Sequence, residues 1–268
     1  MVVCLKFIGR LGEFVNNNDL IIKRISLDRD KIEDFSVYPF NIDLVKNFSE
    51  LEIKSPVTFF VGENGVGKST FIEAIAVNVG LPAEGGTQNF RYHTKDTTSN
   101  LSDFLRVGTF NKAKTKFFLR AESFYNFSTE VQRLVEEDNF YGLYNAYGGN
   151  LHECSHGESF LKLVKNKFTD HGLYILDEPE AALSPQRQLS LLCLIDQLVK
   201  EGSQFIIATH SPILISYRNG VILDLNNNFK GIDYKDTEIY SLYKLYLEDP
   251  EGMQCRLFDV EINDDKLN

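Results

Sequence analysis

The sequence lacks the features of a disulfide-rich, zinc-binding or membrane-spanning protein. Its four cysteines, Cys4, Cys154, Cys193 and Cys255, lie far apart and form no C-x-x-C pair, which argues against a disulfide framework or a zinc site. We expect Cys193, which lies in an apolar helical run, in the core. No apolar run reaches the roughly 18 residues that a membrane span needs. The N-terminal segment has no cleavable signal layout, so we expect a cytoplasmic protein without a membrane span.

Basic residues are also too few for a generally basic surface. The chain has 28 Lys and Arg against 38 Asp and Glu, a formal net charge of −10, which argues against a broad nucleic-acid interface. Small basic clusters at residues 112–120 and 162–167 are interpreted first as solvated faces. A nucleic-acid partner therefore stays possible but is not indicated. The sequence contains no internal repeat, heptad run or low-complexity tract.

A glycine-rich stretch, residues 62–69, fits the pattern G-x-x-x-x-G-K-[ST]. The short, apolar and β-rich segment 57–61 precedes it, as expected of a buried parallel strand. Apolar residues at helical spacing follow, from Phe71 to Val79. Because strand, glycine loop and helix occur in this order, the pattern predicts a phosphate-binding loop rather than a chance glycine-rich turn.

Each residue type in this loop has a physical reason to be there. The glycines Gly62, Gly65 and Gly67 permit backbone conformations that turn successive N–H groups towards an anion, and the helix N-terminus adds partial positive charge. Lys68 can reach the β- and γ-phosphates, and the Ser69 hydroxyl can bind Mg²⁺. We predict that the loop binds a nucleoside triphosphate. The predicted binding residues are Gly62, Asn64, Gly65, Val66, Gly67, Lys68, Ser69 and Thr70.

A second apolar segment, residues 173–176, ends in the acidic pair Asp177 and Glu178. A carboxylate at the end of a buried parallel strand can face a metal ion near the phosphate loop, so Asp177 is the candidate metal-associated acid. Glu178 is the candidate general base that orients the attacking water. The alternative is a polar cap at the turn before Pro179.

The order of the remaining segments predicts an α/β fold with a mostly parallel sheet covered on both faces, because strands alternate with helices. At 268 residues, the chain fits one large domain. We expect a core of about residues 1–82 and 168–235, an inserted and largely helical lobe of about 83–167, and a helical C-terminal segment of about 236–268.

The stretch 155–158, Ser-His-Gly-Glu, can be explained alone as a capping box that starts a helix. Together with the phosphate loop and the acidic pair, it resembles the signature sequence of ABC-type ATPases, in the form used by soluble members. Residues 181–184 resemble the D-loop of that family, although Ser184 stands where the family usually has Asp. Residues 205–210 resemble its switch strand, which ends at His210.

The resemblance covers most of residues 51–215 and is nearest to small stand-alone bacterial ATPases related to the chromosome-maintenance group. It implies ATP and Mg²⁺ as ligands, a γ-phosphate contact from His210, and a contact from Ser155 and Gly157 to a nucleotide on another subunit. The family's Q-loop glutamine is not evident; Glu122 either takes that metal- or water-sensing place or is a surface carboxylate. Tyr38 and Phe40 are candidates for stacking on adenine, with core positions as the favoured interpretation.

The resemblance further implies a soluble Mg²⁺-dependent ATPase whose two composite sites form in an ATP-induced homodimer. One alternative is a slow, ATP-switched binding module that acts on an unknown protein or nucleic-acid partner. A less favoured alternative is the ATPase subunit of an ABC transporter.

Overall fold

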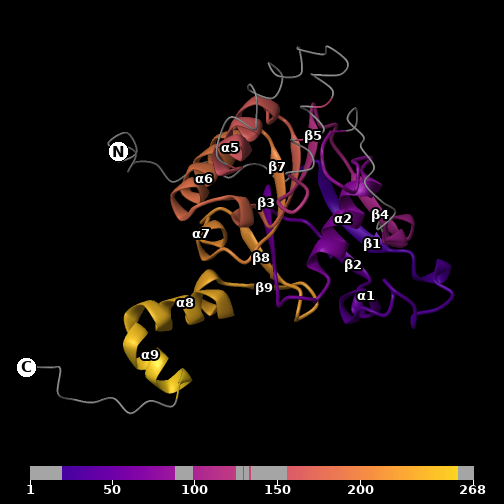
Figure 1. Ribbon diagram of the computed structural model, residues 1–268. Coiled ribbons are helices and arrows are strands. Elements are labelled where there is room, and N and C mark those ends of the chain that lie inside the picture. The colour runs from indigo at the N-terminus through magenta and orange to yellow at the C-terminus, as the bar shows by residue number, and fades with distance from the viewer. Residues whose placement is uncertain (1–19, 88–98, 125–128, 130–132, 134–155, 259–268) are drawn as a thin grey trace, which may run out of the picture.

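A computed structural model of the protein describes residues 20–87, 99–124, 129, 133 and 156–258, and these form two sheets with helices packed against them (Figure 1). The larger sheet has six strands in the order β5-β6-β7-β3-β8-β9. Its strands are β5 (Lys116–Arg120), β6 (Leu173–Asp177), β7 (Gln204–Ala208), β3 (Val57–Val61), β8 (Val221–Asp224) and β9 (Lys230–Ile232). All neighbouring pairs are parallel except the β8–β9 hairpin. The predicted α/β fold with a mostly parallel sheet is therefore confirmed.

The smaller sheet is antiparallel, with the order β2-β1-β4. Its strands are β1 (Ile22–Leu27), β2 (Glu50–Glu52) and β4 (Leu105–Thr109). The buried Gln204 side chain joins the two sheets. Its Oε1 accepts hydrogen bonds from the backbone N–H groups of Ile21 (2.9 Å) and Ile22 (2.8 Å), and its Nε2 donates to the Ile22 carbonyl (2.9 Å). All three bonds are buried, so this side chain satisfies the start of β1 where the sheets meet.

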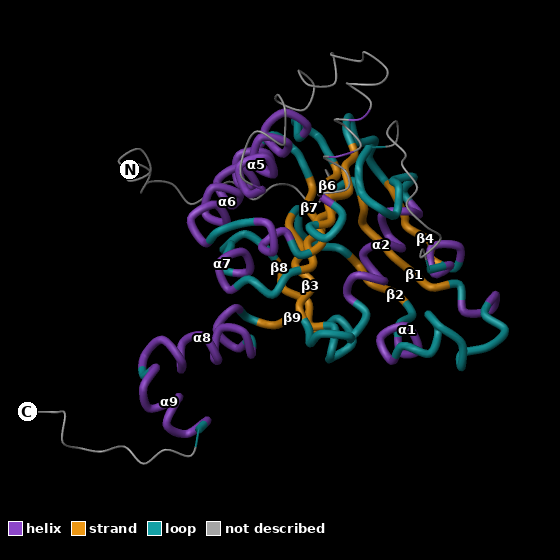
Figure 2. Tube along the Cα trace, viewed as in Figure 1, coloured by secondary structure: helices purple, strands orange, loops and turns teal. Residues whose placement is uncertain are grey.

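Helix α2 lies on one face of the larger sheet, and α5, α6 and α7 lie on the other (Figure 2). The helices of the described residues are α1 (Asp43–Asn47), α2 (Lys68–Asn78), α5 (His156–Lys167), α6 (Pro185–Lys200), α7 (Pro212–Ile215), α8 (Glu238–Glu248) and α9 (Pro250–Leu257). Short 3-10 turns are η2 (Arg29–Lys31), η3 (Asn100–Asp103), η5 (Pro179–Ala182) and η6 (Tyr234–Asp236). Within residues 83–167, β4 and β5 belong to the sheets, and α5 is helical as expected.

Two hydrophobic cores explain why β3, β6 and β7 are mostly apolar and are buried along their whole length. Successive strand residues point to opposite faces. Phe60 packs into the core with α1, α2 and β1, whereas its neighbour Phe59 packs into the core with α5, α6 and α7. Ile206 and Ile207 on β7 divide in the same way. A sheet buried on both faces has no polar alternation, which is the pattern that predicted these strands.

Helix α6 packs on the second core through side chains that recur at helical spacing. Leu191, Ile195, Leu198 and Val199 are all buried. Cys193 lies off this stripe and is exposed, so the expectation that it is a core residue is wrong. The apolar composition of the segment did not reveal which face of the helix carries it.

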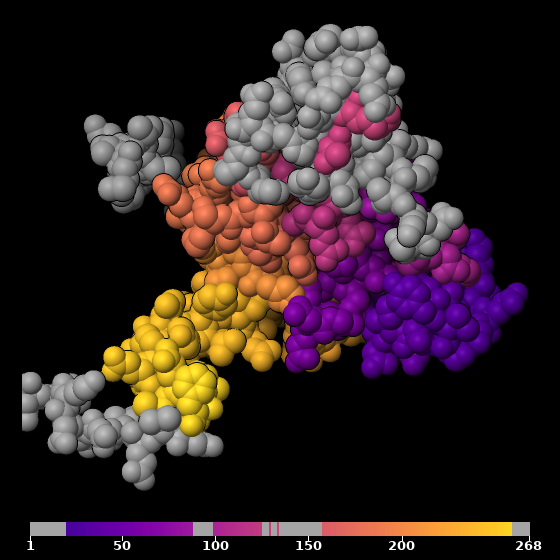
Figure 3. All heavy atoms as spheres, in the orientation of Figure 1, coloured from indigo at the N-terminus to yellow at the C-terminus, as the bar shows by residue number. Residues whose placement is uncertain are grey.

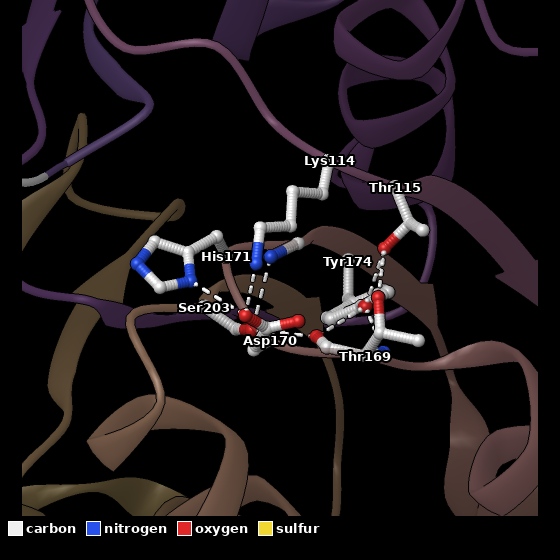
Figure 4. Close-up of polar contacts among 8 residues, drawn as sticks. Lys114, Thr115, Thr169, Asp170, His171, Tyr174 and Ser203 are labelled. Carbon is white, nitrogen blue, oxygen red and sulfur yellow. Dashed lines mark hydrogen bonds and ion pairs between the residues drawn. The ribbon is translucent and has the colours of Figure 1, made fainter.

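A polar cluster joins the loops at the amino ends of β5, β6 and β7 (Figure 4). The Tyr174 hydroxyl donates to the Thr169 carbonyl (2.7 Å), accepts the Thr169 backbone N–H (2.5 Å), and lies 2.7 Å from the Thr115 hydroxyl. The Ser203 hydroxyl donates to the same Thr169 carbonyl (2.9 Å). Asp170 pairs there with the side chains of Lys114 and His171. The cluster lies at the end of the sheet opposite to Asp177, and it fixes loop geometry there.

The C-terminal helices α8 and α9 extend away from the sheets, as the space-filling view shows (Figure 3). Helix α8 has no buried residue, and Leu242, Tyr243 and Leu247 are among its exposed apolar side chains. These two helices lie within the predicted helical segment of about 236–268, of which the structure describes residues up to 258. In the part of the chain that the structure describes, no helix is long and apolar enough to cross a membrane.

Candidate nucleotide site

The phosphate loop connects the end of β3 to the start of α2, as the sequence pattern predicted. Gly65 and Gly67 have φ angles of +84° and +104°, in the region that side chains with a Cβ rarely adopt. At Gly67 a Cβ would also lie 3.0 Å from Cγ2 of Ile42. Helix α2 begins at the next residue, Lys68, so the loop ends directly in a helix N-terminus. This is the geometry that holds an anion with backbone N–H groups.

Lys68 lies folded against its own loop. Its Nζ donates to the carbonyl oxygens of Gly62 (2.9 Å) and Glu63 (2.8 Å), and the residue is 4% exposed. Burial lowers the pKa of Lys68, while the negative charges of Glu178 and Asp177 act in the opposite direction. The ammonium group therefore lies among acids and carbonyl oxygens, with its charge available to a phosphate.

Asp177 is at the carboxyl end of β6 and faces the phosphate loop. The Ser69 hydroxyl donates to its Oδ1 (3.2 Å), so the two predicted metal-associated groups are in contact. Burial raises the Asp177 pKa to about 6, against the opposing effect of the Arg120 guanidinium. In the described residues there is no cluster of three or more His, Cys, Asp or Glu that could hold a metal ion unaided. A hydroxyl and one carboxylate are a fitting partial set for Mg²⁺, which completes its shell with water and phosphate oxygens.

Arg120 is a site residue that sequence reasoning missed. It lies opposite Asp177 in the parallel register of β5 and β6. Its Nε is 3.4 Å from Asp177 Oδ2, and its Nη1 donates to Glu73 Oε2 on α2 (2.7 Å). All three side chains are less than one-fifth exposed, so one guanidinium compensates two buried carboxylates. An Arg at the end of an apolar segment was the available signal, but only the register brings it to Asp177.

Glu178 and His210 come together from neighbouring strand ends. Glu178 has a left-handed backbone (φ +49°), and its backbone N–H donates to the Ala208 carbonyl (2.9 Å). Its Oε1 is 3.8 Å from His210 Nε2. Burial, followed by the charge of Lys68, lowers the His210 pKa, which Glu178 partly offsets. The buried His210 Nε2 makes no hydrogen bond among the described residues. A buried ring nitrogen without a protein partner, beside a carboxylate, fits a site that binds a phosphate oxygen or a water molecule.

Of the predicted signature residues, Gly157 lies in the first turn of α5. Ser155 lies outside the described residues. Gly157 is buried, and a Cβ there would lie 2.8 Å from the Ala182 carbonyl and 2.7 Å from Arg187 Nη1. Only glycine therefore fits where α5 meets η5 and α6 without a shift of its neighbours.

The remaining loop and Q-loop candidates differ in exposure. Asn64 is exposed, Val66 is partly buried against the first core, and Glu122 is exposed just after β5. The charge of Glu122 is the smallest of the effects that raise the Asp177 pKa. Glu122 is therefore near the acid but has no direct contact described with it.

The two aromatic candidates separate clearly. Phe40 is 7% exposed and packs edge-on against Phe104, so its interpretation as a core residue is confirmed. Tyr38 is 57% exposed, and its hydroxyl lies 3.3 Å from the Thr70 hydroxyl in the first turn of α2. A core position for Tyr38 was therefore the wrong interpretation. Its ring is exposed to solvent beside the first turn of α2.

A hollow of about 510 Å³ adjoins the loop on the side of β8 and β9. Residues 62–64 and His210 line one wall, and Leu242 and Tyr243 of α8 line another. The Asn226 side chain between them accepts the backbone N–H of Glu63 (3.3 Å). The phosphate end of the site thus opens towards the exposed apolar helix.

Comparisons with known proteins agree with this arrangement. The family model described as "AAA ATPase domain" matches residues 88–215, which include β6, the acidic pair and His210. The nucleoside import ATP-binding protein NupA of Lactococcus lactis is 24% identical over 63% of this chain and 38% of its own length. A putative ABC transporter ATP-binding protein of Bacillus thuringiensis is 28% identical over 56% of this chain and 29% of its own. The chain is thus similar to ABC-type ATP-binding proteins.

The chain spans less than two fifths of the length of either curated relative. Among solved structures, the SMC head domain from Thermotoga maritima is similar with a TM-score of 0.42 and 16% identity, covering 76% of this chain and 94% of that one. An ATP-binding cassette of an ABC transporter is similar with a TM-score of 0.45 and 17% identity, covering 88% and 98%.

Proposed function

We propose that this ABC-type domain hydrolyses ATP with Mg²⁺ at a site that is completed by a second copy of the chain. The observation that carries the proposal is that five side chains meet at the carboxyl ends of three adjacent parallel strands: Lys68, Ser69, Asp177, Glu178 and His210. Among the described residues, His210 Nε2 has no hydrogen-bond partner. Ligands of open α/β sheets bind at such strand ends.

In this proposal each group has one task. The loop N–H groups and Lys68 hold the β- and γ-phosphates, and Asp177 with Ser69 holds the hydrated Mg²⁺. Bound Mg²⁺ supplies charge neutralisation for the phosphates. Glu178 orients and deprotonates the attacking water, and the His210 imidazole donates to the γ-phosphate. The Glu178 side chain is 37% exposed, and its Oε1 lies 3.8 Å from His210 Nε2, so both side chains reach the same small volume.

The shared site is proposed from the family resemblance. Gly157 lies in the first turn of α5 and packs against η5 of its own chain. In the proposed dimer, Ser155 and Gly157 contact the γ-phosphate of a nucleotide bound by the other subunit, as the family resemblance implies. A closed two-fold dimer would bury two nucleotides between the phosphate loop of one chain and the signature helix of the other.

Tyr38 is the proposed adenine contact. Its exposed ring lies beside Thr70, at the start of the helix that follows the phosphate loop. An aromatic face in this place can stack on a base at a modest cost in side-chain entropy. Replacing Tyr38 by Ala should raise the KM for ATP several-fold with little change in kcat, whereas Phe at this position should preserve the KM.

The decisive experiment combines turnover with particle size. Wild-type protein should hydrolyse ATP in a Mg²⁺-dependent manner, Lys68→Ala should lose nucleotide binding, and Glu178→Gln should accumulate as an ATP-bound dimer in size-exclusion chromatography with light scattering. A mixture of Lys68→Ala with a Gly157→Arg variant should regain part of the activity, because one of its two composite sites is intact. Wild-type turnover in Glu178→Gln, or a monomer with ATP in every variant, would contradict the proposal.

The similarity to transporter ATP-binding proteins favours a second candidate, the nucleotide-binding subunit of an importer. In that case the ATPase rate should depend on an integral-membrane partner that co-purifies with the chain. Full turnover by the isolated chain, unchanged by detergent-solubilised membranes, would favour the stand-alone enzyme. An ATP-dependent dimer whose turnover stays very slow with every partner would instead indicate an ATP-switched binding module.

A further inference from the structure

The turn that carries His210 is held by a partly buried acid, Glu180, which is outside the predicted nucleotide contacts. Glu180, in η5, accepts the backbone N–H of His210 at Oε1 (2.5 Å) and the Thr209 hydroxyl at Oε2 (2.7 Å). One bond ends on the backbone of His210, and the other ends on the side chain of the preceding residue, Thr209. The carboxylate therefore sets where the Cα of His210 lies, because two bonds from one planar group fix both position and orientation.

A second set of bonds closes the same turn from the other side. The Ser211 hydroxyl donates to Gln188 Oε1 on α6 (2.5 Å), and the Ser211 backbone N–H donates to the Thr209 hydroxyl (3.0 Å). Gln188 is itself anchored by a hydrogen bond from its Nε2 to the Leu183 carbonyl (3.1 Å). Gln188 thus anchors the turn at Ser211, and Glu180 anchors it at Thr209 and His210.

Placing the Glu180 carboxylate in this turn costs folding free energy, because the charged group is largely removed from water. Burial raises its pKa, and the nearby charge of Glu178 acts in the same direction, while the bonds from Thr209 and His210 act against them. Within the described part of the chain, its carboxylate forms no ion pair. A buried carboxylate without a cation costs stability unless its hydrogen bonds compensate. The hydrogen bonds that offset this cost come from the Thr209 hydroxyl and the His210 N–H, the two groups that place the imidazole.

We propose that Glu180 is a positioning residue that aims the His210 imidazole at the γ-phosphate of bound ATP. The inference rests on the proposed function, because it assigns Glu180 an effect through His210. Without the carboxylate, the His210 N–H and the Thr209 hydroxyl lose their acceptors, and the imidazole can swing away from the position 3.8 Å from Glu178. Glu180 itself touches neither nucleotide nor water in this scheme.

The test is a double-mutant cycle between Glu180 and His210. Glu180→Ala should lower kcat by about tenfold or more with KM for ATP changed less than about twofold, since charge-assisted hydrogen bonds are lost from the catalytic arrangement only. Glu180→Gln keeps one acceptor for the His210 N–H and should recover most of the rate. His210→Ala and the Glu180→Ala/His210→Ala double variant should have the same kcat, because Glu180 acts only through the imidazole.

The controls separate positioning from a general loss of structure. Thr209→Val removes one bond to Glu180 and should lower kcat less than Glu180→Ala. Glu248→Ala removes an exposed acid on α8 and should leave kcat unchanged. Additive losses in the cycle, or wild-type kcat in Glu180→Ala, would overturn the inference while Lys68→Ala and Glu178→Gln still report on the proposed function. Should Glu180→Ala fail to fold, the Glu180→Gln and Thr209→Val variants are carried through the same cycle.

A readout without hydrolysis keeps the two proposals distinguishable. The ratio of the Kd for ADP to the Kd for ATP, measured with fluorescent analogues, reports the γ-phosphate contact alone. His210→Ala and Glu180→Ala should reduce this ratio by the same factor. A Glu180→Ala protein with the wild-type ratio, or a wild-type protein with no preference for ATP, would overturn the positioning role even if no turnover were measurable.

Discussion

Replacing Asp177 by Asn should make the nucleotide-free, metal-free protein more stable at neutral and alkaline pH. Burial raises the pKa of this side chain from its ordinary value of 3.8 to about 6. Each pKa unit corresponds to about 1.4 kcal/mol, so ionised Asp177 costs the fold about 3 kcal/mol above pH 7. Asn resembles the protonated acid and avoids this cost, although its amide faces Arg120 less favourably. We therefore expect a gain of about 2–3 kcal/mol.

The pH window follows from the sign of the shift. The folded state binds the Asp177 proton more tightly than the unfolded state, so the wild-type protein keeps the full contribution below pH 3.8 and loses it as pH rises through about 6. The difference in unfolding free energy between Asp177→Asn and wild type should be close to zero at the acid limit and largest above pH 7. Urea unfolding followed by circular dichroism in EDTA, from pH 4 to pH 8, measures this difference directly.

Asp170→Asn is the matched control, because a hydrogen bond from Lys114 lowers the Asp170 pKa and reverses the sign. This variant should be less stable than wild type at neutral pH, and the deficit should shrink as the pH falls. Saturating Mg²⁺ and ATP should also reverse the order of stability for Asp177. Wild type should gain about 2.7 kcal/mol at a hundredfold excess over Kd, and Asp177→Asn should gain little. A pH-independent difference, or a less stable Asp177→Asn at pH 8 without ligand, would refute this reasoning.

Three further substitutions test particular contacts. Arg120→Met leaves the buried Glu73 and Asp177 without their cation and should lower stability by about 2–4 kcal/mol in urea unfolding; an unchanged midpoint would contradict the pairing. Gly157→Ala places a Cβ 2.8 Å from a carbonyl oxygen of η5, so turnover should fall while nucleotide affinity, read by fluorescence titration, stays constant. Tyr174→Phe removes a hydroxyl with three partners and should cost about 1–3 kcal/mol in stability. Because it lies at the far end of the sheet, its kcat should equal that of wild type.

The fold could be predicted because its determinants are local. The five-residue strands β3, β6 and β7 are buried along their whole length, and such strands have a continuous apolar signature. The loop that follows β3 has its glycines where the backbone has positive φ angles. The helix after residue 237 also follows from local pattern. Local pattern did not predict which face of a helix is buried, because Cys193 was expected in the core and is exposed.

For the site as well, local motifs predicted some features and tertiary contacts decided the others. The sequence alone determined the chemistry of the groups, because a phosphate loop, an acidic strand end and a histidine after an apolar strand are each contiguous motifs whose residue types suit one ligand. Only the tertiary structure decided which groups meet. The register of β5 against β6 brings Arg120 to Asp177, and the path of η5 brings Glu180 to His210. Those contacts join segments far apart in the chain, and no local pattern encodes a distance between them.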